Sequence, residues 1–393
     1  MRLLVLTHNY PRFPGDPAGA YVARLARAAA DAGIEVRVIA PHISGTSEHE
    51  QERGLDLRRF RYAPTALERV GYRGASERVL QPLTLALAPL YLFAFRRAAR
   101  RAVAELRPAV VHAHWWFPAG WVASGLGAPY LVTSHGSDVR LFDRGGWWRR
   151  TGRRVLARAA TVTTASRFLA GDLERHAGLL ARPIMVTPMP LDVTRFEAGR
   201  ATPKAVPPRI LFAGNLVPSK GVDVLIRALA VLKARGVSCR VKILGEGTAR
   251  ASLEQLAAQA GIGADIEWSP FLPQDRMPAE YGASTITVLP SRGQAEGLGL
   301  TLVEALLAGC AVVGTPAGGI PEVVQDGVTG LIARDGDAAD LAEKLARLLS
   351  DADLRERLTQ AGRRMALATY ATEPAARRFL DLYNAIARDH QTR

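Results

Sequence analysis

Two glutamates separated by a glycine-rich turn are the residues of this sequence best suited to chemistry. They lie in SRGQAEGLGLTLVEA, residues 291–305, where Glu296 and Glu304 stand eight positions apart. Two neighbouring carboxylates could act as a general acid and a general base. Glycines beside them leave backbone amides open, so the same stretch could instead bind an anion and accept hydrogen bonds from hydroxyls.

The elements expected around this stretch favour binding. TITVLPS is predicted to be a strand, SRGQAEGLG a loop and LTLVEALLAG a helix, so both glutamates face one crevice at the carboxyl-terminal edge of a sheet. The amides of Gly297, Leu298 and Gly299 are expected at the same crevice, at the positive end of the helix. An anion bound there would be a phosphate, and the carboxylate on each side could accept hydrogen bonds from hydroxyls. A nucleotide attached to a sugar has this combination of groups.

A second anion site is predicted in the same half of the chain. In FAGNLVPSKG a glycine-containing loop leaves a strand, and Lys220 comes just before a helix expected from about Val222. In LGEGTAR, Gly245 and Gly247 would let a backbone approach a ligand closely, although such glycines also make plain turns. Taken singly, the lysine and each glutamate are typical of a solvated surface; their combination favours a site.

Short apolar runs alternate with helical patterns along the chain, and the alternation repeats after residue 205. This is typical of α/β domains with parallel sheets. The predicted fold class is therefore α/β, with two doubly wound, Rossmann-like domains at residues 1–200 and 205–370 and a final amphipathic helix at 371–393. Three prolines predict a linker at 198–209.

Positive charge is concentrated in the first half. The net charge is +14, and residues 1–200 hold 29 arginines, no lysine and 16 acidic residues. Nucleic acid, an anionic membrane surface or an acidic substrate would suit this excess, and a coding bias toward arginine would produce it too. Cys239 and Cys310 are too few for a disulfide framework and are not spaced as metal ligands. No secretory signal follows Met1, so we expect a cytoplasmic protein.

Residues 79–95, VLQPLTLALAPLYLFAF, form an apolar run of 17 residues flanked by arginines. A spanning helix needs roughly 20 apolar residues, and Pro82 and Pro89 are both expected to interrupt one here. We expect a buried or groove-lining helix; a helix lying in the interface of an anionic membrane is the alternative.

These motifs resemble the retaining glycosyltransferases of family 4, whose mark is a Glu, seven residues and a second Glu. The resemblance covers nearly the whole chain: the glycine loop at Gly19, SHGSD at 134–138, SKG around Lys220, LGEG, EGLGLTLVEA, GGIPEVV with DGVTGL, and the closing helix. It implies the GT-B fold, in which two Rossmann-like domains face an interdomain cleft and the C-terminal helix packs back toward the N-terminal domain.

The resemblance also implies roles for single residues. Glu296 would contact the donor sugar, Glu304 the ribose and Lys220 the diphosphate, while His135 would lie beside the transferred sugar and Asp138 would face the acceptor. Backbone contacts to the donor are implied for Gly19, Gly245, Leu272, Gly297, Leu298 and Gly299. The reaction implied is transfer of a sugar from a nucleoside diphosphate to a hydroxyl with retention of configuration and without a metal or other cofactor.

Three segments depart from the family pattern. Asn215 replaces the usual arginine before the lysine, and we predict that Arg292 supplies the missing charge on the diphosphate. Pro270 replaces a glycine before the base-binding turn at 271–272. Met189 and Pro190 stand where the family usually has Asn-Gly, in a segment near the acceptor.

The main prediction is thus a bacterial hexosyltransferase that uses a UDP- or GDP-linked sugar and a glycan or lipid-linked acceptor, in cell-surface polysaccharide or glycolipid synthesis. It would work in the cytoplasm, with peripheral contact to an anionic membrane, and would not bind nucleic acid. The alternatives are a nucleotide-sugar epimerase, a phosphorylase, or a non-catalytic relative that binds nucleotide sugars or polyanions.

Overall fold

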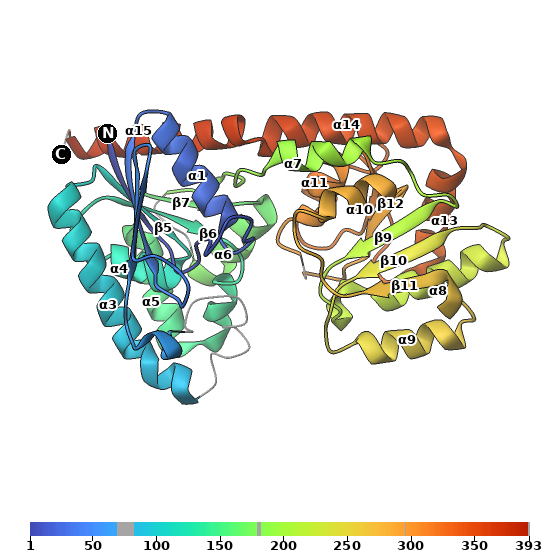
Figure 1. Ribbon diagram of the computed structural model, residues 1–393, viewed down its shortest axis with the longest axis horizontal. Helices are drawn as coiled ribbons and strands as arrows, with labels where there is room; N and C mark the ends of the chain where they lie inside the picture. The colour runs from blue at the N-terminus through green and yellow to red at the C-terminus, as the bar shows by residue number, and fades with distance from the viewer. Residues whose placement is uncertain (69–81, 179–181, 295, 392–393) are drawn as a thin grey trace. The chain divides into compact units, whose positions relative to one another are not determined.

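The computed structural model describes residues 1–68, 82–178, 182–294 and 296–391. The chain divides into two compact units, Met1–Leu191 with Thr372–Arg393, and Asp192–Ala371 (Figure 1). Each unit contains one largely parallel sheet with helices packed on it. The predicted fold class, α/β with two Rossmann-like domains, is confirmed.

The sheet of the first unit has the strand order β3-β4-β2-β1-β5-β6-β7-β8 in the described residues. All its pairings are parallel except that of β3 with β4. The strands are β1 Arg2–Leu6, β2 Glu35–Pro41, β3 His49–Glu52, β4 Leu55–Phe60, β5 Val110–His114, β6 Tyr130–Ser134, β7 Thr161–Thr164 and β8 Met185–Val186. The β3–β4 hairpin was not predicted from the sequence because its first strand, HEQE, is polar and exposed.

Helices cover both faces of this sheet. They are α1 Ala20–Asp31, α3 Pro82–Leu106, α4 Trp121–Ala123, α5 Gly146–Arg158, α6 Arg167–Ala177 and α15 Thr372–Gln391, with 3-10 turns at Thr65–Leu67 and Val139–Arg144 and a wide turn at Trp116–Gly120. Alternate residues of β1 point to opposite faces, so Leu3 packs with α1 and α15 whereas Leu4 packs with α3. The final helix therefore belongs to the first unit.

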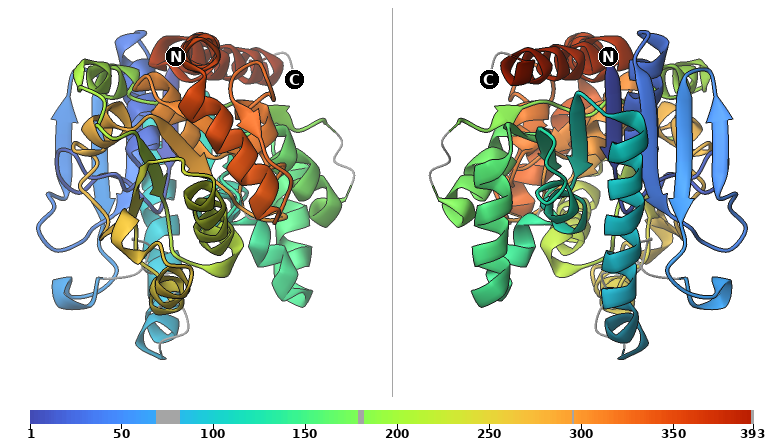
Figure 2. Two further views of the ribbon diagram at one scale, coloured as in Figure 1. Left: turned by 90° about the vertical axis from the view of Figure 1, so that its right-hand side faces the viewer. Right: turned by 90° about the vertical axis from the view of Figure 1, so that its left-hand side faces the viewer.

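Residues 82–95 of the apolar run form the start of α3, a single helix that Pro89 does not break; residues 79–81 lie outside the described residues. A proline inside a helix removes a hydrogen bond at a cost of ~3 kcal/mol. Packing beyond the proline offsets this, because Phe95 is fully buried and its ring stacks on Phe60 at 4.8 Å. Figure 2 shows α3 in teal alongside the blue strands of the sheet. None of the described helices is long and apolar enough to cross a membrane.

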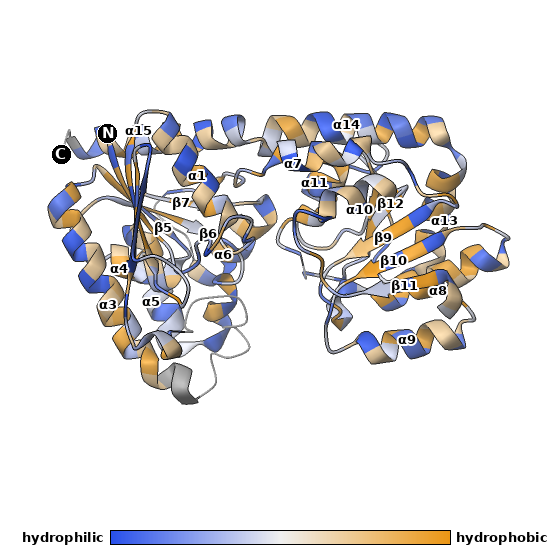
Figure 3. Ribbon diagram, viewed as in Figure 1, coloured by the Kyte–Doolittle hydropathy of each residue, from blue (hydrophilic) through white to orange (hydrophobic). Residues whose placement is uncertain are grey.

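The sheet of the second unit is wholly parallel, with the order β11-β10-β9-β12-β13-β14 in the described residues. Its strands are β9 Arg209–Ala213, β10 Arg240–Leu244, β11 Ile266–Ser269, β12 Ile286–Leu289, β13 Ala311–Gly314 and β14 Leu331–Ile332. The helices are α7 Val193–Glu197, α8 Val222–Ala234, α9 Arg250–Gln259, α10 Met277–Ala283, α11 Leu300–Leu307, α12 Ile320–Val323, α13 Ala338–Ser350 and α14 Ala352–Tyr370, with 3-10 turns at Ala198–Ala201, Pro218–Lys220 and Gly263–Asp265. Strand β9 is hydrophobic after its first residue, Arg209 (Figure 3), as expected for a strand covered on both faces.

The prolines at 198–209 do not mark the boundary between the units. The chain passes from one unit to the other after Leu191 and after Ala371, so this segment belongs to the second unit. It is fixed to α10: Ala205 N donates to Ala283 O at 2.9 Å, and a Cβ on Gly199 would lie 2.2 Å from Pro278 O. A segment held by such backbone contacts is not a free linker.

The return of α15 to the first unit places Tyr383 in its core, where the hydroxyl bonds His112 Nδ1 at 2.7 Å. Tyr383→Phe should cost about 1–3 kcal/mol of unfolding free energy, because it leaves a buried ring nitrogen without this partner while packing is preserved. Urea unfolding followed by tryptophan emission measures this, since every tryptophan except Trp268 lies in the first unit.

The matched control is Asn384→Ala, an exposed position on the same helix. It should change stability by less than about 0.5 kcal/mol. Equal midpoints for the Tyr383→Phe variant and the unchanged protein would contradict the assigned bond.

Candidate functional site

The predicted site residues gather where the strand order of each sheet reverses. In the second unit this point lies between β9 and β12, and in the first between β1 and β5. Open α/β sheets bind ligands just outside the carboxyl ends of the strands at such a point. The loop after β9 carries Lys220, and the loop after β12 carries Glu296.

Lys220 and Glu296 form an ion pair, although 76 residues separate them in the chain. Their side chains are only 17% and 13% exposed, so the charges interact largely out of water. Ser291 Oγ donates to the same carboxylate oxygen at 3.1 Å. A cation and a carboxylate thus stand together at the carboxyl edge of the sheet, able to serve an anionic group and a hydroxyl respectively.

Gly221 allows the two loops to meet. It has a positive φ of 66°, and a Cβ there would lie 1.9 Å from Pro290 O. Any other residue would push apart the loop after β9 and the end of β12. The ion pair therefore depends on a glycine that the sequence analysis quoted in SKG but gave no role.

The loop containing Glu296 is held from its other side by Gly318 and Gly319. Their amides donate to the carbonyls of Gly293 and Glu296, each at 2.9 Å. A Cβ on Gly318 would lie 1.9 Å from Glu296 O. The GGIPEVV motif therefore positions Glu296 by backbone contact, which a sequence pattern alone does not reveal.

Glu304 lies on α11, which begins directly after Gly299, and its Oε2 accepts a hydrogen bond from the Tyr281 hydroxyl at 2.8 Å. Tyr281 is only 1% exposed. Burial, reinforced by the Glu304 carboxylate, raises the pKa of this hydroxyl well above its usual value. Tyr281 is thus a fixed donor that orients Glu304, and it was not singled out from the sequence.

Arg292 lies close to the loop of Lys220, since its backbone amide donates to Ser219 O at 2.9 Å. Its guanidinium is paired with Asp223 at 2.6 Å, at the start of α8. Asn215 is exposed in the loop after β9. That Arg292 supplies the positive charge missing at Asn215 therefore stays a prediction. Asp223 would compete with the diphosphate for this guanidinium.

The LGEG glycines serve the fold. A Cβ on Gly245 would lie 1.9 Å from Gly214 O, and one on Gly247 would lie 2.2 Å from Leu216 O. These glycines therefore admit a neighbouring backbone. The contact of Gly245 with a donor stays a prediction. Leu272 lies half-buried in the loop after β11, and its contact with a base stays a prediction.

In the first unit, His135 follows β6 and lies within a cluster of rings. Its Nε2 is 3.1 Å from His114 Nδ1, and its ring centroid is 4.4 Å from that of Trp115 and 5.0 Å from that of Tyr21. Burial, and then the neighbouring His112 and His8, lower the pKa of His135 to about 3. The imidazole is therefore neutral near pH 7, and one proton is shared between His114 and His135.

Asp138 is hydrogen-bonded within the loop after β6. It is 2% exposed; Oδ1 accepts from Ser134 Oγ at 2.9 Å and His135 N at 3.0 Å, and Oδ2 accepts from Trp116 N at 3.0 Å. Both oxygens are engaged within the protein, so this carboxylate organises the loop after β6. The contact of Asp138 with an acceptor stays a prediction.

Gly19 opens α1 with a φ of 67°, and a Cβ there would lie 2.1 Å from Asn9 O. The glycine thus lets the loop after β1 lie against the start of the helix. Its contact with a phosphate stays a prediction.

Sequence reasoning missed the polar residues that end β1 and β5. Among the described residues, His8 Nδ1 and Asn9 Oδ1 are buried without a hydrogen-bond partner. Trp115 has a φ of 69°, which is rare for a bulky side chain and is often found at functional sites. The polar ends of THNY and HAHW were the available signal, because strand ends at a switch point face ligands.

Known proteins resemble this chain throughout its length. Residues 196–365 match the family model for glycosyl transferases group 1, and residues 18–195 match that for glycosyltransferase family 4. A D-inositol 3-phosphate glycosyltransferase of Acidothermus cellulolyticus is 31% identical over 91% of this chain and 84% of its own length. The chain belongs to the group 1 glycosyltransferases of family 4.

Solved structures agree on the fold of this glycosyltransferase. The sucrose-phosphate synthase of Thermosynechococcus elongatus has a TM-score of 0.77 at 20% identity and covers 98% of each chain. Anabaena HepE, solved in complex with UDP-glucose, has a TM-score of 0.69 at 18% identity over 98% of this chain and 100% of its own. The fold is that of the GT-B glycosyltransferases.

In the described residues of this glycosyltransferase, no group of three or more His, Cys, Asp or Glu side chains is arranged to hold a metal ion. The independence from metal expected from the sequence stays a prediction.

The buried histidines should make the first unit of this glycosyltransferase sensitive to acid. His112 is fully buried and its pKa is lowered from 6.5 to about 3 by burial. Because the unfolded chain takes up a proton near pH 6.5 and the folded one does not, this stability is present above pH 6.5 and is lost as the pH falls. At pH 5 the loss should be about 2 kcal/mol for one such histidine.

The measurement is urea unfolding by tryptophan emission at several pH values between 6.5 and 5, where carboxylates titrate little. In the His112→Asn variant the slope of unfolding free energy against pH should correspond to about one proton fewer. An unchanged slope would show that His112 is already protonated in the folded state.

Gly318→Ala should disturb the loop of Glu296. The left-handed conformation costs about 1–2 kcal/mol for any non-glycine residue, and crowding against the Glu296 carbonyl should add about 1–3 kcal/mol. Gly336→Ala is the matched control, since Gly336 has a φ of 70° but a Cβ there would meet nothing within 4 Å. Thermal unfolding followed by circular dichroism should separate the two variants; equal costs would rule out the backbone contact.

Proposed function

We propose that this glycosyltransferase moves a sugar from a UDP- or GDP-linked donor to a hydroxyl of a glycan or lipid-linked acceptor, with retention of configuration. The observation that carries the proposal is the Lys220–Glu296 pair at the switch point of the second sheet. Nucleotide sugars combine a diphosphate with hydroxyls, and this pair offers a cation for the first and a carboxylate for the second.

The donor would be divided among the groups around this pair. Lys220 and the amides of Gly297 to Gly299 would bind the diphosphate, Glu296 would accept from sugar hydroxyls, and Glu304, oriented by Tyr281, would accept from the ribose. HepE supports a nucleotide-sugar donor, since that relative in fold is described in complex with UDP-glucose.

Two observations support a hydroxyl-rich acceptor: the name of a relative and the neutral state of His135. The curated relative from Acidothermus is named as acting on D-inositol 3-phosphate, a polyol bearing many hydroxyls. The neutral imidazole of His135 can exchange hydrogen bonds with a sugar without adding charge. A hydroxyl-rich acceptor in cell-surface polysaccharide or glycolipid synthesis fits both observations.

In the proposed reaction the bond from the anomeric carbon to the diphosphate breaks, and a bond from that carbon to the acceptor oxygen forms on the same face. The acceptor proton passes to an oxygen of the departing phosphate. Negative charge that builds on the diphosphate is stabilised by Lys220 and by fixed amides, which is the role that a metal plays elsewhere. Neither Glu296 nor Glu304 needs to exchange a proton.

Thermal melts of the full chain against a panel of UDP- and GDP-linked sugars test the donor site. At least one sugar nucleotide should raise the melting temperature, also in the presence of a chelator, because ligands that bind only the folded state stabilise it. Lys220→Ala should weaken that ligand by roughly 10- to 100-fold, the loss expected for one hydrogen bond to a charged group. Glu304→Ala should weaken it too.

Lys233→Ala is the matched control, since it removes an exposed lysine from α8 in the same unit. It should leave the shift intact. Arg292→Ala in the same panel tests whether Arg292 replaces the charge missing at Asn215; unchanged affinity would refute that. Failure of every nucleotide sugar, or an undiminished shift with Lys220→Ala, would overturn the proposed function, and an inverted anomer in the product would overturn retention.

A further inference from the structure

Helix α5 carries an unusual amount of positive charge. Its sequence, GWWRRTGRRVLAR, contains five arginines and no acidic residue in 13 positions. Its buried side is made by Gly152, Val155 and Leu156. The arginines Arg149, Arg150, Arg153, Arg154 and Arg158 are all exposed.

An exposed tryptophan shares the outward side of this helix. Trp147 is followed at spacings of three, four and four residues by Arg150, Arg154 and Arg158, so these four side chains form one stripe along the helix. Trp147 is 53% exposed. We call Trp147, Arg150, Arg154 and Arg158 the α5 stripe.

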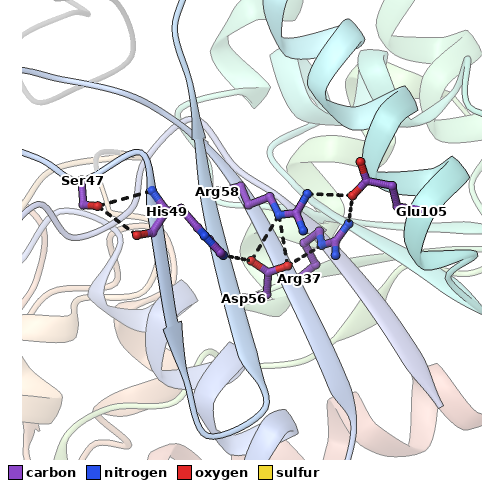
Figure 4. Close-up of polar contacts among 6 residues, drawn as sticks. All are labelled: Arg37, Ser47, His49, Asp56, Arg58 and Glu105. Carbon is purple, nitrogen blue, oxygen red and sulfur yellow. Dashed lines mark hydrogen bonds and ion pairs between the residues drawn. The ribbon is translucent and has the colours of Figure 1, made fainter.

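Several arginines elsewhere in the first unit are paired with acids. Figure 4 shows Arg37 and Arg58 between Asp56 and Glu105: Arg37 donates to Asp56 at 2.7 Å and to Glu105 at 2.8 Å, and Arg58 donates to Glu105 at 2.7 Å. Within the residues that the structure describes, none of the α5 arginines forms an ion pair; Arg153 donates to a carbonyl, that of His176, at 3.3 Å.

The arrangement of charge on α5 is unfavourable for the isolated helix. Arg150 stands four positions from Arg154, and Arg154 four from Arg158, so like charges are neighbours on its surface. Arg149 and Arg150 also lie near the positive end of the helix dipole. An anionic partner would relieve both repulsions, and four of the arginines with Gly146 line one surface hollow.

The aromatic residue at the end of the stripe is anchored. The Trp147 ring packs edge-on against Trp148 at 5.0 Å and against Phe117 at 6.0 Å. Its outer side remains in water. A tryptophan that is apolar on one side and wet on the other is the side chain preferred at the boundary between lipid and water.

We propose that the α5 stripe is a docking surface for an anionic lipid bilayer, with the arginines at the lipid phosphates and Trp147 at the level of the headgroups. Basic amphipathic helices with an aromatic residue bind such surfaces. Single-stranded nucleic acid fits less well, because it needs successive aromatic platforms along a groove, and the stripe offers one exposed ring on a convex helix. This inference identifies a surface and does not depend on the donor chemistry proposed above.

The test is sedimentation of the full chain with vesicles of phosphatidylcholine alone and of equal parts phosphatidylcholine and phosphatidylglycerol. Binding is expected only to the anionic vesicles and should weaken as salt rises. Arg150→Gln with Arg154→Gln should weaken it roughly 30-fold, from the surface attraction typical of two arginines. Trp147→Ala should weaken binding without changing its salt dependence.

The matched control is Arg97→Gln with Arg100→Gln, which removes the same charge from exposed positions on α3. It should bind as the unchanged protein does. Equal loss in both double variants would show that total charge, or α3, is responsible and would overturn the proposal. The absence of binding to anionic vesicles would also overturn it. So would a result in which Arg150→Gln with Arg154→Gln weakens binding to a single-stranded oligonucleotide but leaves binding to the vesicles unchanged.

Circular dichroism melts of the Arg150→Gln, Arg154→Gln variant should match those of the unchanged protein, which excludes unfolding as the cause. Nucleotide-sugar shifts in the same variant should also be unchanged. Vesicle binding without any nucleotide-sugar shift would support the α5 proposal and contradict the proposed function. A nucleotide-sugar shift without vesicle binding would support the proposed function and contradict the α5 proposal.

Discussion

The attraction between Lys220 and Glu296 is the interaction on which the second unit is organised at its carboxyl edge. Each charge is largely shielded from water, which strengthens the attraction between them. The pair joins the loop after β9 to the loop after β12, where the strand order reverses. Gly221 and Gly318 admit the backbone contacts that bring the loops together. The ion pair and the close backbone contacts thus hold the same loops together.

The sheet of the first unit also reverses its strand order, and the residues at that point have different chemistry. Its switch point between β1 and β5 is lined by neutral rings, because burial lowers the pKa values of His8, His112 and His135 far below 7. Asp138, the one buried carboxylate of the loop after β6, is consumed by hydrogen bonds within that loop. Neutral donors and acceptors suit hydroxyl groups, whereas the lysine of the second unit suits a phosphate.

Positive charge in the first unit is likewise divided by its surroundings. Arg37 and Arg58 are balanced by Asp56 and Glu105 at the edge of the sheet, and such partly exposed pairs add little stability. The arginines of α5 lie among no acids of their own helix. Total charge therefore describes this surface poorly, since what matters is which arginines retain their attraction for an external anion.

The sequence by itself determined the strands and helices around the site, the repeated α/β organisation, and the place of Lys220 and Glu296 in loops after strands and of Glu304 on a helix. These follow from periodic burial, which neighbouring residues encode locally. Only the tertiary structure decided that α3 continues through Pro89, that residues 198–209 are fixed to α10, that Gly245 admits a neighbouring strand, and that Tyr281 orients Glu304. Each of these depends on contact between segments far apart in the chain, and such contacts are set by packing in three dimensions, which local patterns do not record.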